Sequence, residues 1–196
     1  PTKRIFDYED IKGEAHEIKA KNINPYLVDA KNIFVSKRTK PLCNVPKILK
    51  GNYYAKSEGL IVEEKDLEYL ITNEPNSKKY IKLLIGADEF INNRKRYCLW
   101  LVNCPPEELR KMPLILERIR RVKADRLTSS DKAMQKLAMT PTLFRETNNP
   151  DSCLVIPVVS SELRDYIPMG FIDKDTISTH GDLIMKKSNN STKYVE

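Results

Sequence analysis

Prolines divide the middle of the chain into short helices. Asn103 precedes two prolines and two glutamates, the usual order of a helix cap, a first-turn proline and acidic residues near the helix N-terminus. Pro113 must kink or restart that helix, because a proline inside a helix removes a backbone hydrogen bond. A third helix, beginning near residues 129–131, must end before Pro141. The middle of the chain is therefore expected to be a helical block.

Apolar segments with strand character lie on both sides of this block. Residues 96–102 are the strongest candidate, and a hairpin turn at 92–93 fits because asparagine tolerates the left-handed conformation. The pattern predicts an α+β fold, a single domain with a mixed or mostly antiparallel sheet and a central helical block. Further strands are expected at 24–28, 33–35, 60–62, 153–159, 169–172 and 183–185, and an amphipathic helix at 63–72.

The two ends of the chain are expected to lie outside the folded domain. Residues 1–20 mix charged and apolar positions without a clear period, so they are interpreted as a lead-in from the preceding domain of a longer polypeptide. Residues 21–190 are expected to form the domain, which is long enough to bury a core. Residues 191–196 are interpreted as a truncated C-terminal end, since a new pattern begins there.

Composition narrows the class of protein. No apolar run approaches the roughly 18 residues that a membrane span needs, and no signal-peptide segment begins the chain. The four cysteines form no C-x-x-C pair and the two histidines lie far apart, so no metal site is expected. This use of cysteine is typical of a reduced, cytoplasmic protein.

Positive charge is concentrated in one segment. The net charge is +7, and residues 94–136 contain twelve lysines and arginines against five acidic residues, while the rest of the chain is balanced. Such a surface favours a polyanion, because neutralising phosphates releases counterions. The alternative is a solvated, salt-bridged helix face. The candidate phosphate-binding residues are Arg94, Lys95, Arg96, Arg118, Arg120, Arg121, Lys123, Arg126, Lys132 and Lys136.

The motifs of common catalytic sites are missing. The chain has no Gly-rich phosphate loop, no G-x-G-x-x-G and no G-x-S-x-G. Acid pairs such as Glu63–Glu64 stand at helix starts, where the helix dipole explains them. No catalytic residue is assigned, and the chain is not expected to be an enzyme by itself; a hydrolase domain is disfavoured.

Seven motifs follow one another in a fixed order between residues 20 and 190. They are NPYLV (24–28), GADEFIN (86–92), RYCLWL (96–101), PPEEL (105–109), ERI (117–119), KLAMTPTLF (136–144) and VVSSELRDYIPMGF (158–171). Together they resemble the target recognition domain of MmeI-type (type IIG/IIL) restriction–modification enzymes. In the last motif, the apolar flanks are expected to anchor a polar tip, residues 160–166.

The resemblance implies sequence-specific binding of double-stranded DNA. It also implies a methyltransferase domain on the same polypeptide, in a bacterial parent that is a DNA adenine-N6 methyltransferase and type II restriction endonuclease. S-adenosylmethionine and Mg would serve that parent, with no cofactor in this fragment. Leu163 replaces the arginine of the commoner form, which removes a phosphate contact. The base-reading candidates that it implies are Glu162, Arg164, Ser161 and Tyr166.

The chemistry of two of these residues suits base recognition. Arginine can donate two hydrogen bonds to guanine, and glutamate can accept one from cytosine. In an extended segment, Glu162 and Arg164 would project from the same side and address one G·C pair. The alternatives are a surface ion pair of little energetic weight and, for the whole chain, a non-catalytic protein-interaction module with a basic surface.

Overall fold

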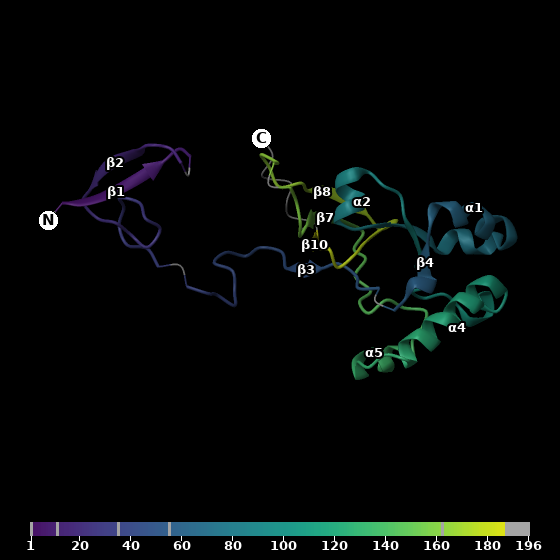
Figure 1. Cartoon of the computed structure of the whole chain (residues 1–196). Helices are drawn as coiled ribbons and strands as arrows, with labels where there is room; N and C mark the ends of the chain where they lie inside the picture. Colours follow the sequence, from purple (N-terminus) through teal and green to yellow (C-terminus); the bar gives the residue numbers. More distant parts are fainter. Residues whose placement is uncertain (1, 11, 35, 55, 162, 187–196) are drawn as a thin grey trace. The chain divides into compact units, whose positions relative to one another are not determined.

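The structure is a computed structural model that describes residues 2–10, 12–34, 36–54, 56–161 and 163–186 (Figure 1). It divides into two compact units, Pro1–Val45 (the N-terminal unit) and Pro46–Glu196 (the main unit). The predicted domain boundary after residue 20 stays a prediction, and the predicted C-terminal end at 191–196 lies outside the described residues.

The N-terminal unit begins with a two-stranded hairpin. Strand β1 (Lys3–Tyr8) pairs with β2 (Ala15–Ala20) in an antiparallel register from Lys3↔Ala20 to Tyr8↔Ala15. These two strands were not predicted, and the interpretation of residues 1–20 as a lead-in from a preceding domain stays a prediction. Nearly every residue of the hairpin is exposed, so burial left no periodic signal in its sequence.

A loop follows where two strands were predicted. Asn24 Oδ1 accepts hydrogen bonds from the backbone N–H groups of Tyr26 and Val28, and Leu27 has a left-handed φ of 61°. Asp29 Oδ1 accepts two further backbone hydrogen bonds, which hold the pKa of its carboxyl below the usual value. The strands predicted at 24–28 and 33–35 are absent from the described residues, because side-chain acceptors direct this backbone into turns instead.

The first sheet of the main unit is mixed. Strands β4 (Ile61–Val62), β6 (Tyr97–Leu99), β5 (Ile81–Ile85) and β9 (Thr176–Ser178) lie in that order. The β4/β6 and β6/β5 pairs are antiparallel, and β5/β9 is parallel. The connection from β5 to β6 is not a tight hairpin turn, because it contains α2 (Ala87–Asn92), which Asn93 ends in a left-handed conformation with φ 52°.

The second sheet is antiparallel throughout. Its order is β3 (Ile48–Lys50), β10 (Asp182–Lys186), β7 (Ser152–Pro157) and β8 (Gly170–Asp173). Cys153, Val155 and Ile184 form its buried side against Ile85 of the first sheet. The predicted strands at 153–159, 169–172 and 183–185 thus occur with small shifts at their ends.

Helices cover the first sheet. The main core joins residues of η1 (Glu58–Leu60), α1 (Glu64–Asn73) and α4 (Pro113–Leu127) to strands β4, β6 and β9. In Figure 1, β4 lies between α1 and α4. Three further short helices are η2 (Pro75–Tyr80), α3 (Pro106–Leu109) and α5 (Lys132–Leu137). The predicted α+β class, with its mixed sheet and central helical block, is confirmed.

A buried asparagine joins the two sheets after β3. Asn52 is fully buried, and its Nδ2 donates to the backbone oxygens of Asn148 and Ser178 while its Oδ1 accepts from the Asn148 N–H. Gly51 is needed beside it, because a Cβ there would lie 2.0 Å from the Thr179 oxygen. This network fixes β3 and the start of β10 beside the strand β9.

Candidate nucleic-acid interface

The loop that joins β7 to β8 carries the residues predicted to read bases. Its strands pair up to Val155↔Gly170, and the chain between them projects beyond the sheet. The Arg164 N–H donates to the Ser161 oxygen at 3.2 Å, and the Leu163 N–H donates to Ser161 Oγ at 3.1 Å. The two antiparallel strands therefore present a hydrogen-bonded turn to solvent.

This turn differs from the predicted extended segment. The hydrogen bond from the Arg164 N–H back to the Ser161 oxygen closes a β-turn, whereas the same-side argument involves Glu162 and stays a prediction. Glu162 lies outside the described residues. Ser161, Arg164 and Tyr166 are all exposed, and their base-reading roles stay predictions.

The apolar flanks of the loop are mostly exposed. Val158, Val159, Ile167 and Met169 are 52–64% exposed, although the strand β7 before them is half buried by alternation. Leu163, at the turn itself, is 89% exposed. Of the flanks expected to anchor the tip, Pro168 is buried, whereas the other four side chains remain on the surface and the paired strands hold the loop.

Arg126 is the clearest correction among the predicted phosphate-binding residues. It is fully buried at the end of α4, where its guanidinium donates to the backbone oxygens of Leu137, Thr140 and Leu143 at 2.6–3.0 Å. It also donates to Ser57 Oγ at 2.5 Å. A guanidinium that binds internal acceptors in this way cannot reach a phosphate.

Two more of the predicted arginines bind the protein itself. Arg118 donates to the backbone oxygens of Gly59 and Ile61 at 3.1 and 2.9 Å, and burial lowers its pKa. Arg96 forms a 3.0 Å ion pair with Glu89. Its guanidinium also lies 5.5 Å from the centre of the Tyr54 ring. These contacts engage both side chains with the protein, but both arginines are partly exposed, so their predicted role in binding phosphates stays a prediction.

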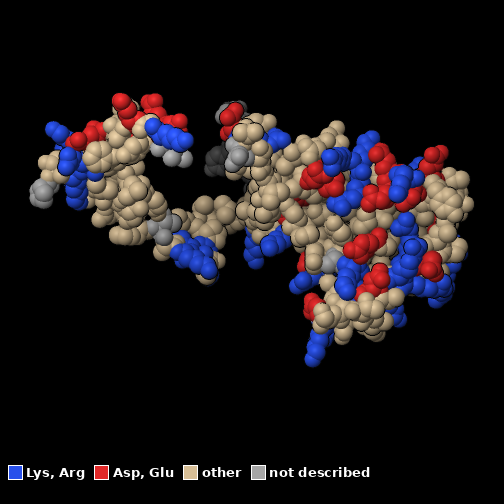
Figure 2. All heavy atoms as spheres, in the orientation of Figure 1, with Lys and Arg blue, Asp and Glu red and all other residues tan. Residues whose placement is uncertain are grey.

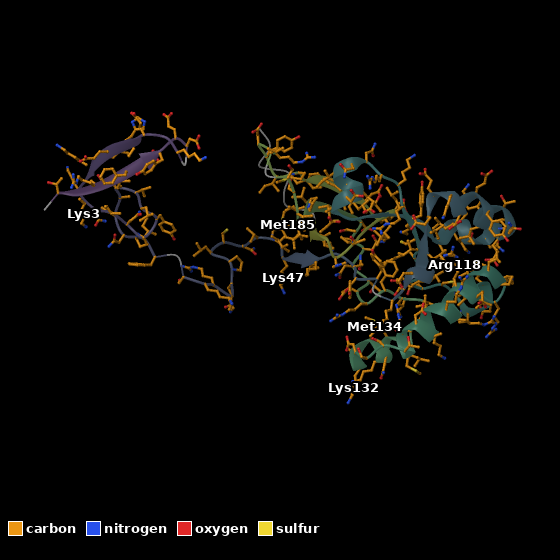
Figure 3. The ribbon with its side chains drawn as sticks, in the orientation of Figure 1. Lys3, Lys47, Arg118, Lys132, Met134 and Met185 are labelled. Atoms are coloured by element: carbon orange, nitrogen blue, oxygen red, sulfur yellow. The ribbon has the colours of Figure 1, made fainter. Side chains whose placement is uncertain are left out.

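The other seven candidates are exposed. Arg94 pairs with Asp88 at 2.9 Å and Arg120 with Glu117 at 3.4 Å, both at the surface. In Figure 3, Lys132 extends away from the start of α5, whereas Arg118 lies against the region of β4. Figure 2 shows Lys and Arg interspersed with Asp and Glu over the helices of the main unit. The exposed candidates are Arg94, Lys95, Arg120, Arg121, Lys123, Lys132 and Lys136.

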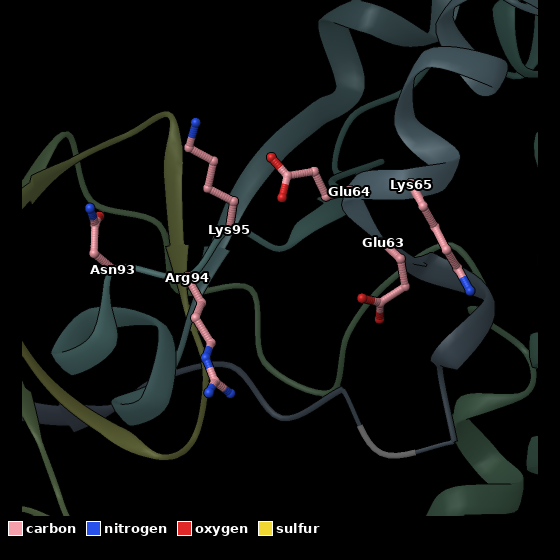
Figure 4. Close-up of a pocket in the computed structure, with 6 residues that line it drawn as sticks. All are labelled: Glu63, Glu64, Lys65, Asn93, Arg94 and Lys95. Atoms are coloured by element: carbon pink, nitrogen blue, oxygen red, sulfur yellow. The ribbon is translucent and has the colours of Figure 1, made fainter.

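A broad open cleft of about 920 Å³ lies beside two of these residues. In Figure 4, Arg94 and Lys95 extend from the α2–β6 connection on one side, and Glu63 and Glu64 stand at the start of α1 on the other. Lys65 lies beside the two glutamates, so the lining mixes three cations with two carboxylates. A phosphate inside this cleft would meet two carboxylates, so the cleft is a poor anion site.

A second cationic segment was missed by the search for a net positive charge. Outside residues 94–136, basic and acidic residues are equal in number, so the net charge there is zero. Residues 31–56 contain seven lysines and arginines and no aspartate or glutamate. All but one of these seven side chains are exposed. A count of each sign along the chain would have found this segment, whereas the search for a net surplus did not.

The described residues offer no other site chemistry. Among them, no group of three or more His, Cys, Asp or Glu side chains could hold a metal ion. Within the same residues, no helix is long and apolar enough to cross a membrane. Cys98 is buried in β6, and burial raises the pKa of its thiol to about 12, so it is unreactive.

Comparison with known proteins gives consistent matches. The family described as "MmeI, target recognition domain" matches residues 29–191. DNA methyltransferase A of Bacillus subtilis (strain 168) is 45% identical over 157 residues, which is 80% of this chain but 18% of that protein. The solved structure of the type IIL restriction–modification enzyme MmeI in complex with DNA is 41% identical, with a TM-score of 0.78 over 95% of this chain and 25% of that one.

Proposed function

The chain belongs to the family of MmeI target recognition domains, and from this premise we propose that it recognises a specific sequence of double-stranded DNA within a restriction–modification enzyme. The observation that carries the proposal is the similarity to MmeI, which was solved in complex with DNA. At 41% identity and a TM-score of 0.78, the match extends over nearly the whole chain.

The β7–β8 loop is the element proposed to read base edges. Arg164 is exposed on it and can donate two parallel hydrogen bonds to guanine in the major groove. Ser161 and Tyr166 are exposed within reach of the same turn, and Glu162, outside the described residues, is the proposed partner for cytosine. The exposed apolar flanks support this role, because buried flanks would restrict how far the loop enters a groove.

The exposed cations are proposed to grip the DNA backbone. Contacts to phosphates set the register of a protein on the duplex but carry no sequence information. The exposed candidates without an ion pair among the described residues are Lys95, before β6, and Arg121, Lys123, Lys132 and Lys136, on or near α4 and α5. Arg126 is removed from the phosphate-binding candidates because its guanidinium is buried and binds internal acceptors, and Arg96 and Arg118 stay among them as partly exposed residues that also bind the protein.

The parent polypeptide is proposed to supply the chemistry. This chain spans about a fifth of the length of its methyltransferase relative and a quarter of MmeI. We infer a DNA adenine-N6 methyltransferase domain on the same polypeptide, with S-adenosylmethionine and Mg bound outside this chain, and an enzyme that works in the bacterial cytoplasm. The chain itself is proposed to be non-catalytic.

Selection from a random library tests the proposal. The complete protein is incubated with duplexes carrying a randomised central segment, and the bound fraction is sequenced over successive rounds. A recognition domain enriches one defined sequence, because each wrong base pair costs about 1–3 kcal/mol. Binding to duplex without enrichment of any sequence would contradict target recognition, and a lack of binding at low salt would contradict DNA binding itself.

A further inference from the structure

The acid-free segment, residues 31–56, has an unusual composition. It contains Lys31, Lys37, Arg38, Lys40, Lys47, Lys50 and Lys56 and no carboxylate, whereas the chain as a whole has 27 acidic residues in 196. At that average, about three or four acidic residues would be expected in a segment of this length. A solvated segment does not need such a bias, since interspersed charges of both signs serve solubility better.

These cations are not neutralised by the protein. Lys37, Arg38 and Lys40 are exposed, and no ion pair among the described residues includes them. In contrast, Arg94, Arg96 and Arg120 of the segment first identified by charge each face a carboxylate within 4 Å. The cations before β3 therefore lie in a segment without carboxylates, whereas those of residues 94–136 share their segment with five acidic residues.

The backbone of the segment suits a long, shallow contact. The described residues from 31 to 47 form no helix or strand, and Pro41 and Pro46 favour extended conformations. Phe34 and Leu42 are 78% and 81% exposed, so the segment buries little of its own apolar surface. An extended cationic segment of this kind can follow a phosphate backbone and become ordered on binding.

We propose that the cations Lys31, Lys37, Arg38 and Lys40 bind the phosphate backbone of the duplex as a second contact, independent of sequence and additional to the β7–β8 loop. This inference rests on the proposed function, because it takes duplex DNA as the ligand. It assigns to the segment a share of the affinity but none of the sequence selectivity.

Two matched triple variants of the complete protein test the inference. K37Q/R38Q/K40Q removes three cations of the acid-free segment. The control K65Q/K78Q/K111Q removes three exposed cations of the main unit, one in α1, one in η2 and one just after α3, so both variants change the net charge by the same amount. The measurement is the logarithm of the binding constant for a duplex plotted against the logarithm of salt concentration.

The expected results differ in slope and in specificity. Each lost phosphate contact reduces the slope by about 0.9, so K37Q/R38Q/K40Q is expected to reduce it by roughly 2 to 3. It should weaken the selected duplex and an unrelated duplex by the same factor, while the control changes the slope by less than about 1. Both variants should still select the wild-type sequence.

The outcomes separate the inference from the function on which it rests. Equal slopes for the two triple variants would overturn the inference, and the proposed function would stand because the wild type still binds and selects. A changed recognition sequence in K37Q/R38Q/K40Q would also overturn it, since the segment would then read bases. Failure of the wild type to bind duplex at low salt would overturn both, and would leave an acidic protein as the alternative partner of the segment.

Discussion

At the scale of single residues, Asp182 shows how burial changes the chemistry of a side chain. It is fully buried at the start of β10, where Oδ2 accepts a hydrogen bond from Ser178 Oγ at 3.1 Å and Oδ1 has no partner within the described residues. Burial, with a smaller contribution from the nearby Glu89, raises the pKa of Asp182 to about 6. Nothing in the sequence marks this aspartate as different from the exposed ones.

The raised pKa predicts a pH dependence of stability. The folded protein holds the Asp182 proton up to about pH 6, whereas the unfolded chain loses it near the ordinary value of 3.8. The unfolding free energy should therefore fall as the pH rises from about 4 to 6. Asp182→Asn should remove this part of the slope, as measured by urea denaturation across that range. Asp151→Asn, at an exposed position, is the control; an unchanged slope in Asp182→Asn would contradict the assignment.

At the scale of elements, α4 shows what periodicity can and cannot predict. Ile115, Ile119 and Val122 recur at the spacing of one helix face, and all three are buried. The same spacing continues to Arg126, which is also buried. The charge of Arg126 suggested a surface role. It is buried because it lies on the apolar face of the helix and because the backbone oxygens of Leu137, Thr140 and Leu143 accept its hydrogen bonds, which the local sequence does not show.

Two substitutions on α4 should separate structural from DNA-binding cations. Arg126→Met leaves the oxygens of Leu137, Thr140 and Leu143 without their donor and should cost about 3–5 kcal/mol of unfolding free energy, measured by urea denaturation. Lys123→Met, three residues earlier and exposed, should change stability by less than about 0.5 kcal/mol.

The salt dependence of DNA binding should give the opposite ranking. Lys123→Met should reduce the slope by about 0.9, as one lost phosphate contact. Arg126→Met, measured at a temperature where it remains folded, should leave the slope unchanged. A stable Arg126→Met variant with a reduced slope would show that the buried arginine reaches DNA after all.

The strands also show that local sequence patterns predict some elements and miss others. Those at 60–62, 153–159, 169–172 and 183–185 were predicted because each is a short apolar run, although their burial differs: β4 is wholly buried, whereas β8 has no buried residue. The helix α2 was missed because its six residues lie between two paired strands, and the left-handed Asn93 that signals a turn there ends the helix instead. The left-handed conformation expected of asparagine occurs at Asn93, but it did not predict that a helix, α2, precedes this residue.

At the scale of the whole molecule, the order of seven motifs predicted the family, and the family match confirms it. The periodicity of single segments could not predict the family, because strands and helices of these lengths occur in many folds. The division after Val45 was not predicted, since the acid-free segment around it contains no run of glycine or serine that would mark a linker. Charge counted by sign is the signal that locates this segment.

The account depends most on the claim that the β7–β8 loop reads DNA sequence. The most direct measurement is the affinity of the complete protein for its selected duplex and for every single-base-pair variant of it, compared between wild type, Arg164→Ala and Arg164→Lys. Arg164→Ala should lose about 1–3 kcal/mol of discrimination at one base pair and none elsewhere. Arg164→Lys should lose most of the same discrimination while it keeps the salt slope, because lysine retains the charge but not the paired donors. Unchanged discrimination at every position, or a uniform weakening of all duplexes, would contradict the account.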